Sequence, residues 1–473
     1  MIPSDYCDFM ELADILKSNG ELPCQRKIYA LILRLAMPAI LAQWASVAMQ
    51  YIDAAMVGSL GASATAAVSV VFSSIWIVIG LCYAINTGFS VQIAHAIGAD
   101  DLEQAKKIFR EGLMICCGIT VLFSIFCIYL SSSLPSLLGA EPKISEKASS
   151  YFFIYACFFP IMQVRLFSAA ALQCIGDTKT PGMLNFLLCL LDVIFNYFMI
   201  LPTHIFEIGT FSLRIPGAGL GVTGAALGTA FSEIIIATIM FLKAFNQPKL
   251  HFNFTIKAFS KSILKDAVKI SYPLALESIA LNGTYIFITS IIAPIGTIAL
   301  AANIFGITTE QICSLPGIGI SVAATTLIGQ ALGAHRKDLA RKFAWATVKL
   351  GIAIAIMIGI VLYVFAHSIF ACLTPDVATQ ELSVTILRIE LFSEPLFAAA
   401  LVIGGILRGA KDTFVASTVT LSCLWLVFIP LALLLVKNNG LVGIWIAFCV
   451  DFCVRGLLLL LRLRSEKSWM KYS

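Results

Sequence analysis

The chain has 473 residues, of which 59% are hydrophobic and 12% are charged, and its formal net charge is +5. Soluble domains carry about 25% charged residues, so this composition excludes an ordinary soluble protein and indicates a chain that crosses a membrane many times. The small basic excess does not indicate a nucleic-acid partner, because lysine and arginine also gather in loops beside membrane spans.

The first 27 residues are acidic and then basic, and they lack the apolar core of a signal peptide, so we expect a cytosolic tail at 1–27. Apolar runs long enough to cross about 30 Å of hydrocarbon then recur along the chain. The twelve predicted spans are 31–56, 65–90, 112–132, 150–172, 183–202, 222–243, 271–293, 298–324, 343–366, 384–407, 414–436 and 441–461.

Charge placement supports this topology. With a cytosolic amino terminus, 23 of the 32 lysines and arginines fall in cytosolic segments and four in outside loops, with five inside the spans. Basic residues mark the cytosolic side of membrane proteins. We therefore expect twelve helices in the cell membrane with both termini cytoplasmic, in a protein that works as a monomer. The fourteen cysteines lie mostly in apolar runs without zinc-ligand spacing, so we expect neither a metal site nor a cofactor.

An internal repeat covers most of the chain. A shift of 235 residues places Pro38 on Pro273, and it places segment 96–107 on segment 331–342. Six spans in each half make the halves parallel repeats, related by an axis along the membrane normal. The predicted fold is an all-α polytopic membrane protein with two six-helix lobes. The predicted parts are a first lobe at 28–245, a linker at 246–269, a second lobe at 270–461 and a tail at 462–473.

The first span carries an acid. Gln43, Ser46, Gln50 and Asp53 are spaced three, four and three residues apart, so they form a polar stripe on one helix face. A charge in hydrocarbon costs about 2.5–3.5 kcal/mol on insertion scales, so Asp53 is expected to face a cavity or a partner. The alternative is a packing helix whose acid pairs with a nearby arginine.

Intramembrane acids are not repeated in the two halves, whereas the matched prolines and glycines are. Asp53 falls on Ile288 and Asp192 on Val427, so the acids are additions to a duplicated scaffold. In the fifth span Asn185, Asp192 and Asn196 share one helix face, and two carboxylates in an apolar site can share a proton. The alternative for Asp192 is an ion pair with Arg165 of the fourth span.

The second half has its own acids. Glu277 lies in the seventh span next to a polar stripe that includes Asn282, and Glu390 and Glu394 lie one turn apart in the tenth. Glu390 can instead neutralise Arg388 or lie near the outer surface. Two other acids, Glu233 and Glu310, are secondary candidates. In the twelfth span Asp451 and Arg455 are four residues apart, which favours a local ion pair.

Seven motifs in order resemble the multidrug and toxic compound extrusion (MATE) transporters. They are P-x14-D-x4-G-x2-G at 38–61, IGADDLEQAKK at 97–107, LQCIGDTKTP at 172–181, GxGxxGAALGT at 219–229, IGTIALAAN at 295–303, IGQALGA at 328–334 and ILRGAKDT at 406–413. The resemblance implies a V of two lobes with substrate bound between or within them, and export driven by inward H⁺ or Na⁺ flux.

On this resemblance the ion-coupling residues are Asp53, Asp192 and Asn196. The second-lobe ion or substrate candidates are Glu277, Asn282 and Glu394, the polar cavity stripe is Gln43, Ser46, Gln50 and Asn185, and the hinges are Pro38 and Pro273.

The expected function is a secondary active antiporter that exports organic, cationic drugs, toxins or metabolites in exchange for H⁺ or Na⁺. Its partners are a small-molecule substrate and the lipid bilayer. One alternative is a lipid-linked oligosaccharide flippase, for which more arginines than acids are expected in the central cavity. Another transporter with two six-helix halves is a second alternative. A polytopic membrane enzyme is the other alternative, but the five histidines are scattered and no cluster of catalytic groups is present.

Overall fold

The computed structural model describes residues 12, 15–16, 23–208, 211–252 and 259–470, with the backbone alone for 204–208, 211–215 and 467–468. Most of the predicted amino-terminal tail, part of the predicted linker and the last three residues of the predicted carboxy-terminal tail lie outside the described residues.

The described part of the first half of the chain contains the following helices and a β-hairpin. They are α2 (Gln25–Gly58), α3 (Ala62–Gly98), α4 (Leu102–Leu130), α5 (Leu134–Leu137), α6 (Pro142–Cys174), α7 (Lys179–Ile200), β1 (Pro202–Ile208), β2 (Phe211–Ala218) and α8 (Gly221–Phe245). The second half contains α9 (Lys261–Ile292), η1 (Ala293–Ile295), α10 (Thr297–Gly333), α11 (Lys337–Leu373), α12 (Val377–Leu391), α13 (Glu394–Gly409), α14 (Thr413–Cys423), η2 (Leu424–Phe428), α15 (Ile429–Arg464) and α16 (Glu466–Trp469).

All twelve predicted spans are helical, but two regions differ in detail. Among the described residues, ten helices are long and apolar enough to span a membrane by themselves. The tenth predicted span is broken into α12 and α13, because Pro395 has no amide hydrogen and fits only the first turn of a new helix. The eleventh and twelfth spans run on as one helical segment that turns at Gly440, where φ is 55°.

Two further differences concern the loops. The predicted linker is partly helical, since α9 begins at Lys261, ten residues before the predicted span. The all-α prediction missed the antiparallel β1–β2 hairpin, which occupies the loop where the first half is longer than the second. The sequence of β2 alternates apolar and polar residues over Phe211–Ile215, which is the period of a strand and not of a helix.

The repeat is visible in the backbone turns. Left-handed φ values occur at Gly61 and Gly296, at Asp100 and His335, and at Gly176 and Lys411. Each pair is 235 residues apart. Such conformations are costly for residues with a side chain, so their recurrence at non-glycine positions reflects a turn geometry that both halves inherited.

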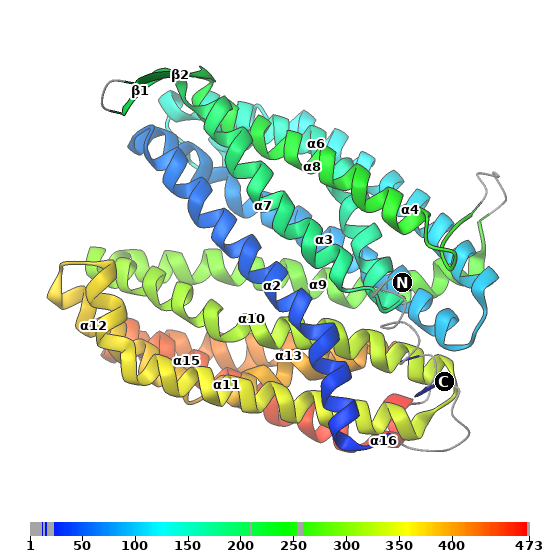
Figure 1. Cartoon of the computed structure of the whole chain (residues 1–473). Coiled ribbons are helices and arrows are strands. Elements are labelled where there is room, and N and C mark those ends of the chain that lie inside the picture. The colour runs from blue at the N-terminus through cyan, green and yellow to red at the C-terminus, as the bar shows by residue number, and fades with distance from the viewer. Residues whose placement is uncertain (1–11, 13–14, 17–22, 209–210, 253–258, 471–473) are drawn as a thin grey trace.

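Figure 1 shows two lobes that separate toward the end carrying the β-hairpin and α12 and that meet at the other end. The lobes exchange the beginnings of their first helices. The start of α2 packs in the second-lobe core, where Ile32 lies with Ile320 and Phe343. The start of α9 packs in the first-lobe core, where Ile263 lies with Phe109. These exchanged segments hold the lobes together at one end.

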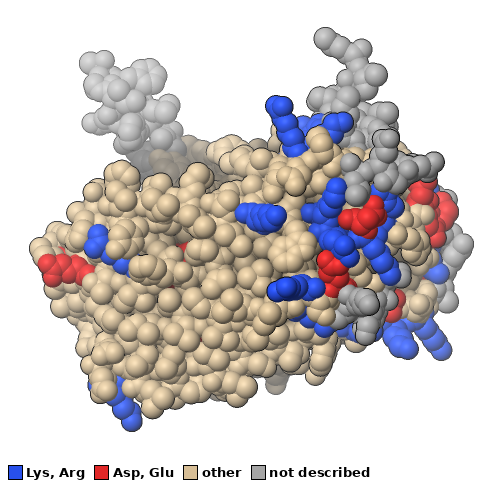
Figure 2. Space-filling model, turned by 90° about the horizontal axis from the view of Figure 1, so that it is seen from below, with Lys and Arg blue, Asp and Glu red and all other residues tan. Residues whose placement is uncertain are grey.

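Basic side chains gather at the same end. Figure 2 shows them over the region where α11 begins and α15 ends, while most of the remaining surface in that view is uncharged. Lys337, Arg341 and Arg464 are exposed there. This distribution is the one expected of a membrane protein with a single basic face.

Two side chains join the lobes through equivalent contacts. The His95 Nε2 atom of α3 lies 2.7 Å from the carbonyl oxygen of Gly409 on α13. The Gln330 Nε2 atom of α10 donates to the carbonyl oxygen of Cys174 on α6 at 2.7 Å. His95 and Gln330 are repeat equivalents, as are Cys174 and Gly409, so one contact is the symmetry copy of the other.

Glycines allow this approach. A Cβ atom added to Gly98 would lie 2.0 Å from the Gln330 carbonyl oxygen, and one added to Gly333 would lie 2.1 Å from the His95 carbonyl oxygen. This contact explains why the repeat retains both glycines, which the sequence comparison showed only as matched scaffold positions.

We expect the double variant His95→Ala/Gln330→Ala to open the end at which the lobes meet. Each lost bond weakens the contact by about 1 kcal/mol, or about fivefold in an equilibrium constant. Cys174 is buried there, so its labelling by a membrane-impermeant maleimide, resolved by mass spectrometry, should accelerate several-fold. Exposed Cys24 and buried Cys116 are the references. Unchanged labelling of Cys174 would show that these bonds do not hold the end closed.

Candidate ion-coupling and substrate sites

The first-lobe site is a pair of carboxylates held by one amide. The Nδ2 atom of Asn196 donates to Asp53 Oδ1 at 2.8 Å and to Asp192 Oδ2 at 2.9 Å. An amide NH₂ group has two hydrogens, so one goes to each acid. Asp192 and Asn196 are fully buried on α7, and Asp53 is half-buried on α2. The structure therefore brings Asp53 together with Asp192 and with Asn196, which lies 143 positions later in the chain.

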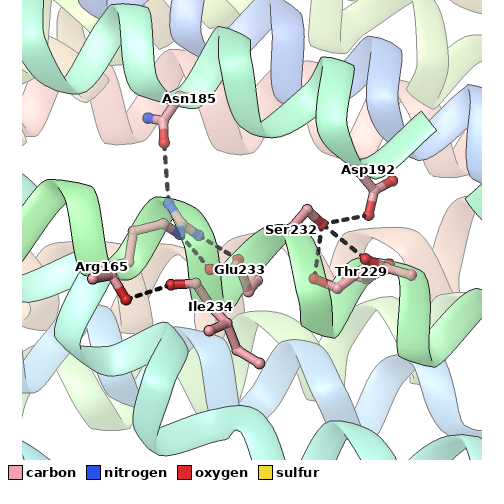
Figure 3. Close-up of polar contacts among 9 residues, drawn as sticks. Arg165, Asn185, Asp192, Thr229, Ser232, Glu233 and Ile234 are labelled. Carbon is pink, nitrogen blue, oxygen red and sulfur yellow. Dashed lines mark hydrogen bonds and ion pairs between the residues drawn. The ribbon is translucent and has the colours of Figure 1, made fainter. Parts of the chain in front are cut away.

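A third helix completes the pocket. The Ser232 Oγ atom of α8 lies 3.3 Å from Asp192 Oδ1, close to the limit for a hydrogen bond, and the same hydroxyl can donate to the carbonyls of Gly228 and Thr229 (Figure 3). The missing side chain of Gly228 leaves room for Asn196. Neither Ser232 nor Gly228 stands out in the sequence as a site residue, although the GxGxxGAALGT motif contains the glycine.

Arg165 does not pair with Asp192, so that alternative is wrong. Its Nε and Nη2 atoms donate to Glu233 at 2.6 and 2.9 Å, and its Nη1 atom donates to Asn185 at 3.1 Å. Glu233 on α8 thus neutralises the guanidinium on one side of α7, as Figure 3 shows, and Asp192 lies farther along the helix. A bidentate arginine–carboxylate pair, with two parallel hydrogen bonds, is the strongest geometry for these side chains. Glu233 offers this geometry to Arg165.

The consequence is a pair of acids without a base. No described lysine or arginine forms an ion pair with Asp53 or Asp192. Two neighbouring carboxylates away from water cannot both stay charged without a counter-ion, so the pair has to hold a proton or another cation.

The remaining residues of the predicted stripe are less engaged. Gln43, Ser46 and Gln50 are half-buried on α2, and Ser46 donates to the carbonyl of Ala42 on its own helix. Asn185 contributes to the Arg165 cluster and not to the carboxylate pair. Pro38 lies inside α2, where its carbonyl oxygen approaches Gly182 of α7, and Pro273 lies inside α9.

The second lobe contains a separate acidic cluster. Carboxylate oxygens of Glu310, Glu390 and Glu394 lie within 4.8 Å of one another. Both oxygens of Glu394 and one of Glu390 are buried without hydrogen-bond partners. Three such carboxylates can hold protons or one cation. The sequence placed Glu390 and Glu394 on one face, and the structure adds Glu310 from α10.

The other second-lobe candidates lie elsewhere. Glu277 accepts a hydrogen bond from Ser417 Oγ at 2.6 Å and lines a cavity that Glu310 also lines. Asn282 donates to the carbonyl of Ser278 on its own helix and faces Gly80 of α3, at the contact between the lobes. The predicted group of Glu277, Asn282 and Glu394 is therefore distributed over three places.

Two local pairings have clear outcomes. Asp451 and Arg455 form the predicted ion pair. Glu390 does not neutralise Arg388, whose guanidinium carbon lies 4.8 Å from the centre of the Tyr363 ring. That interpretation of Glu390 is wrong, and the acid faces the Glu310 cluster instead.

The sequence profile of the MatE family matches residues 38–198 and 273–434, once in each lobe. The chain belongs to the MATE family. It is a membrane transporter and not an enzyme. The resemblance seen in the seven motifs is thus confirmed, together with the fold that it implied.

Individual relatives match over nearly the whole chain. "Probable multidrug resistance protein NorM" of Thermotoga maritima is 25% identical over 445 residues, which cover 93% of each chain. "Multidrug resistance protein MdtK" of Edwardsiella ictaluri is 26% identical over 93% of this chain and 96% of its own. The crystal structure of the Vibrio cholerae MATE transporter VcmN in its bent form has a TM-score of 0.83 at 22% identity, covering 94% of this chain and 99% of that one.

We expect Gly228→Ala to disable the MATE carboxylate site while Gly118→Ala leaves it intact. A Cβ atom at 228 would lie 2.1 Å from Asn196 Oδ1 and 2.8 Å from its backbone nitrogen, whereas nothing lies within 4 Å of one at 118. Displacing Asn196 separates the two acids. Gradient-driven efflux of a fluorescent cation in vesicles, normalised to protein amount, should fall at least tenfold in Gly228→Ala alone. Equal efflux in the two variants would contradict the role of Asn196.

Proposed function

We propose that this MATE transporter is a secondary active antiporter that exports organic cations in exchange for protons. The observation that carries the proposal is the Asp53–Asp192 pair, which shares one amide and has no basic partner in the described part of the chain. The names of the relatives, multidrug resistance proteins, support a broad set of drug-like substrates. The basic end of the molecule supports a cytosolic position for both termini in the cell membrane.

Proton coupling is favoured over sodium at this pair. The amide hydrogens of Asn196 engage one oxygen of each carboxylate, which leaves fewer oxygens to coordinate a metal cation. A proton needs no such space. When it binds, it removes one charge from a site on α2, and the Asp53 side of that helix can then pack closer to α7.

The proposed cycle alternates two states of α2. With the pair deprotonated and the organic cation as its counter-ion, the charge keeps Asp53 near Asn196 and leaves the substrate path open. Protonation lets α2 bend at Pro38, where the helix lacks one backbone hydrogen bond. Bending releases the substrate outward, and rocking of the lobes about their exchanged segments resets the site.

A sodium-coupled cycle through the second lobe is the alternative. The Glu310, Glu390 and Glu394 cluster favours it, since hard cations bind groups of oxygens. In this version the first-lobe pair holds a proton that does not exchange.

Counter-transport in proteoliposomes tests the proposal. Purified protein is reconstituted, a proton gradient or a sodium gradient is imposed separately, and uptake of a fluorescent organic cation is recorded. We expect uptake with the proton gradient alone. Uptake with sodium alone would select the second-lobe cycle, and no uptake with either gradient across a panel of cations would refute antiport.

A further inference from the structure

The last long helix of each half is followed by a short segment that folds back into a lobe. α8 ends at Phe245 and α15 ends at Arg464, and these two ends are 219 residues apart. Leu250 and Trp469 each lie five residues beyond these ends, so they are repeat equivalents. Both side chains are buried, with exposed fractions of 0% and 1%. The described part of the predicted tail at 462–473 is therefore packed against the second lobe.

Each of these two side chains shares a core with the exchanged start of a first helix. Leu250 belongs to the first-lobe core that contains Ile263 of α9. Trp469 belongs to the second-lobe core that contains Ile28 of α2, and Figure 1 shows α16 near the start of that helix. Ile28 and Ile263 are themselves equivalent in the repeat. The end of each half thus packs with the helix start that the other half contributes.

Further contacts hold the carboxy-terminal segment in place. The Nε1 atom of Trp469 donates to the carbonyl oxygen of Leu463 at 2.9 Å, so the buried indole has its hydrogen-bond partner. Glu466 of α16 forms an ion pair with Arg341 of α11, and Met470 is buried together with the indole. Large core side chains leave a cavity when they are truncated, so we expect Trp469 to contribute most to the position of this segment.

The two packed segments are equivalent, but the helices that they hold are not. α2 starts in the second-lobe core and carries Asp53 at its other end, whereas α9 has Ile288 at the matching position. Pro38 lies between the packed start of α2 and Asp53. A bend at Pro38 moves one lobe relative to the other only if the start of α2 stays fixed in the second lobe.

We infer that Trp469 is a positioning residue for ion coupling. It fixes the start of α2 in the second lobe, so that a change of charge at Asp53 is passed through the bend at Pro38 to the contact between the lobes. This role rests on the proposed function and adds to it a residue that touches neither ion nor substrate. Leu250 fixes the start of α9 in the same way, but that helix has no acid at the matching position and carries no such change.

Hydrogen exchange read by mass spectrometry tests whether Trp469 fixes α2. In the purified full chain, Trp469→Ala should accelerate exchange about fivefold at the amides of 28–35 and leave those of 263–270 unchanged, because local opening follows the loss of buried contacts. Leu250→Ala should have the opposite pattern. Trp469→Leu, which copies the first-half residue, should restore part of the slow exchange. Unchanged exchange at 28–35 in Trp469→Ala overturns the inference.

A cycle of double variants tests the coupling role. Asp53→Asn imitates the protonated acid, and maleimide labelling of buried Cys174 reports on the contact between the lobes. We expect Asp53→Asn to change the labelling rate several-fold in the wild-type background and in Leu250→Ala, and to leave it nearly unchanged in Trp469→Ala. A purely structural role would alter the starting rate and keep the response to Asp53→Asn.

The outcomes separate this role from the proposed function. A full response to Asp53→Asn in Trp469→Ala overturns the inference. No response in the wild-type background refutes the α2 step of the proposed function and the coupling role with it, and hydrogen exchange then decides the anchoring alone. If Trp469→Ala does not fold, Glu466→Lys replaces it, since repulsion from Arg341 loosens the segment without cutting into the core. Arg341→Glu/Glu466→Lys restores the attraction and should return both measurements toward wild type.

Discussion

Asp53→Asn is expected to abolish efflux driven by a proton gradient, with at least a tenfold loss of initial rate at equal protein amount. An amide cannot change charge, so the Asp53–Asp192 pair loses the state change that we propose drives α2. Asp192→Asn should give a similar loss. Transport of a fluorescent cation in everted vesicles, energised by a defined proton gradient, measures the effect.

The controls separate coupling from folding. Glu381 is an exposed acid on α12, far from the site in the chain, so Glu381→Gln should transport at the wild-type rate. Asp53→Glu keeps a titratable group and should retain more activity than Asp53→Asn. Efflux by Asp53→Asn at the wild-type rate, at equal protein amount, would falsify the coupling role.

Arg165→Gln is expected to cause the largest loss of stability. The Arg165–Glu233 pair is almost enclosed, with side chains 12% and 11% exposed, and removing one partner leaves an unpaired charge. Breaking a buried pair in this way costs about 3–5 kcal/mol, whereas removing both charges often costs much less. The double variant Arg165→Gln/Glu233→Gln should therefore melt at a higher temperature than either single variant.

Thermal unfolding in detergent, followed by size-exclusion fluorescence, compares these variants. The Arg336–Asp338 pair is the matched control, because Asp338 is 41% exposed and exposed pairs contribute about 0–1 kcal/mol. Arg336→Gln should shift the melting temperature little. If the loss of stability in the double variant equalled the sum of the losses in the two single variants, mutual neutralisation of the two charges would not explain the role of the pair.

The sequence alone predicts most where the signal is local or repeated. The polar stripe, and the lack of an acid at the position equivalent to Asp53 in the second half, indicated one helix face. The structure brings Asp53 on that face together with Asp192 and Asn196. For the bases the outcome differs, because a basic residue near a span end has several acids within reach. Arg165 pairs with Glu233, which was only a secondary candidate in the sequence. Arg408 lines a cavity and does not lie in a loop.

The second-lobe acids show the same limit. The four-residue spacing of Glu390 and Glu394 placed them on one face, but nothing in the spacing indicated that Glu310, some eighty positions earlier, would join them. Asn282 shared a stripe with Glu277 and yet faces the other lobe. Rotation of a helix about its axis decides which neighbour a polar side chain meets, and that rotation comes from packing along the whole helix.

The amino-acid sequence by itself determined the number of membrane crossings, their duplication, the basic side and the family. These depend on hydrophobicity summed over about 20 residues, on charge outside the spans and on matched motifs, all of which are readable along the chain. Only the tertiary structure decided the partners: Glu233 for Arg165, Asn196 for both first-lobe acids, and the symmetric contacts of His95 and Gln330. The physical reason is that hydrogen bonds and ion pairs act over about 3 Å, and atoms brought that close come from helices whose relative rotation and depth the linear order does not contain.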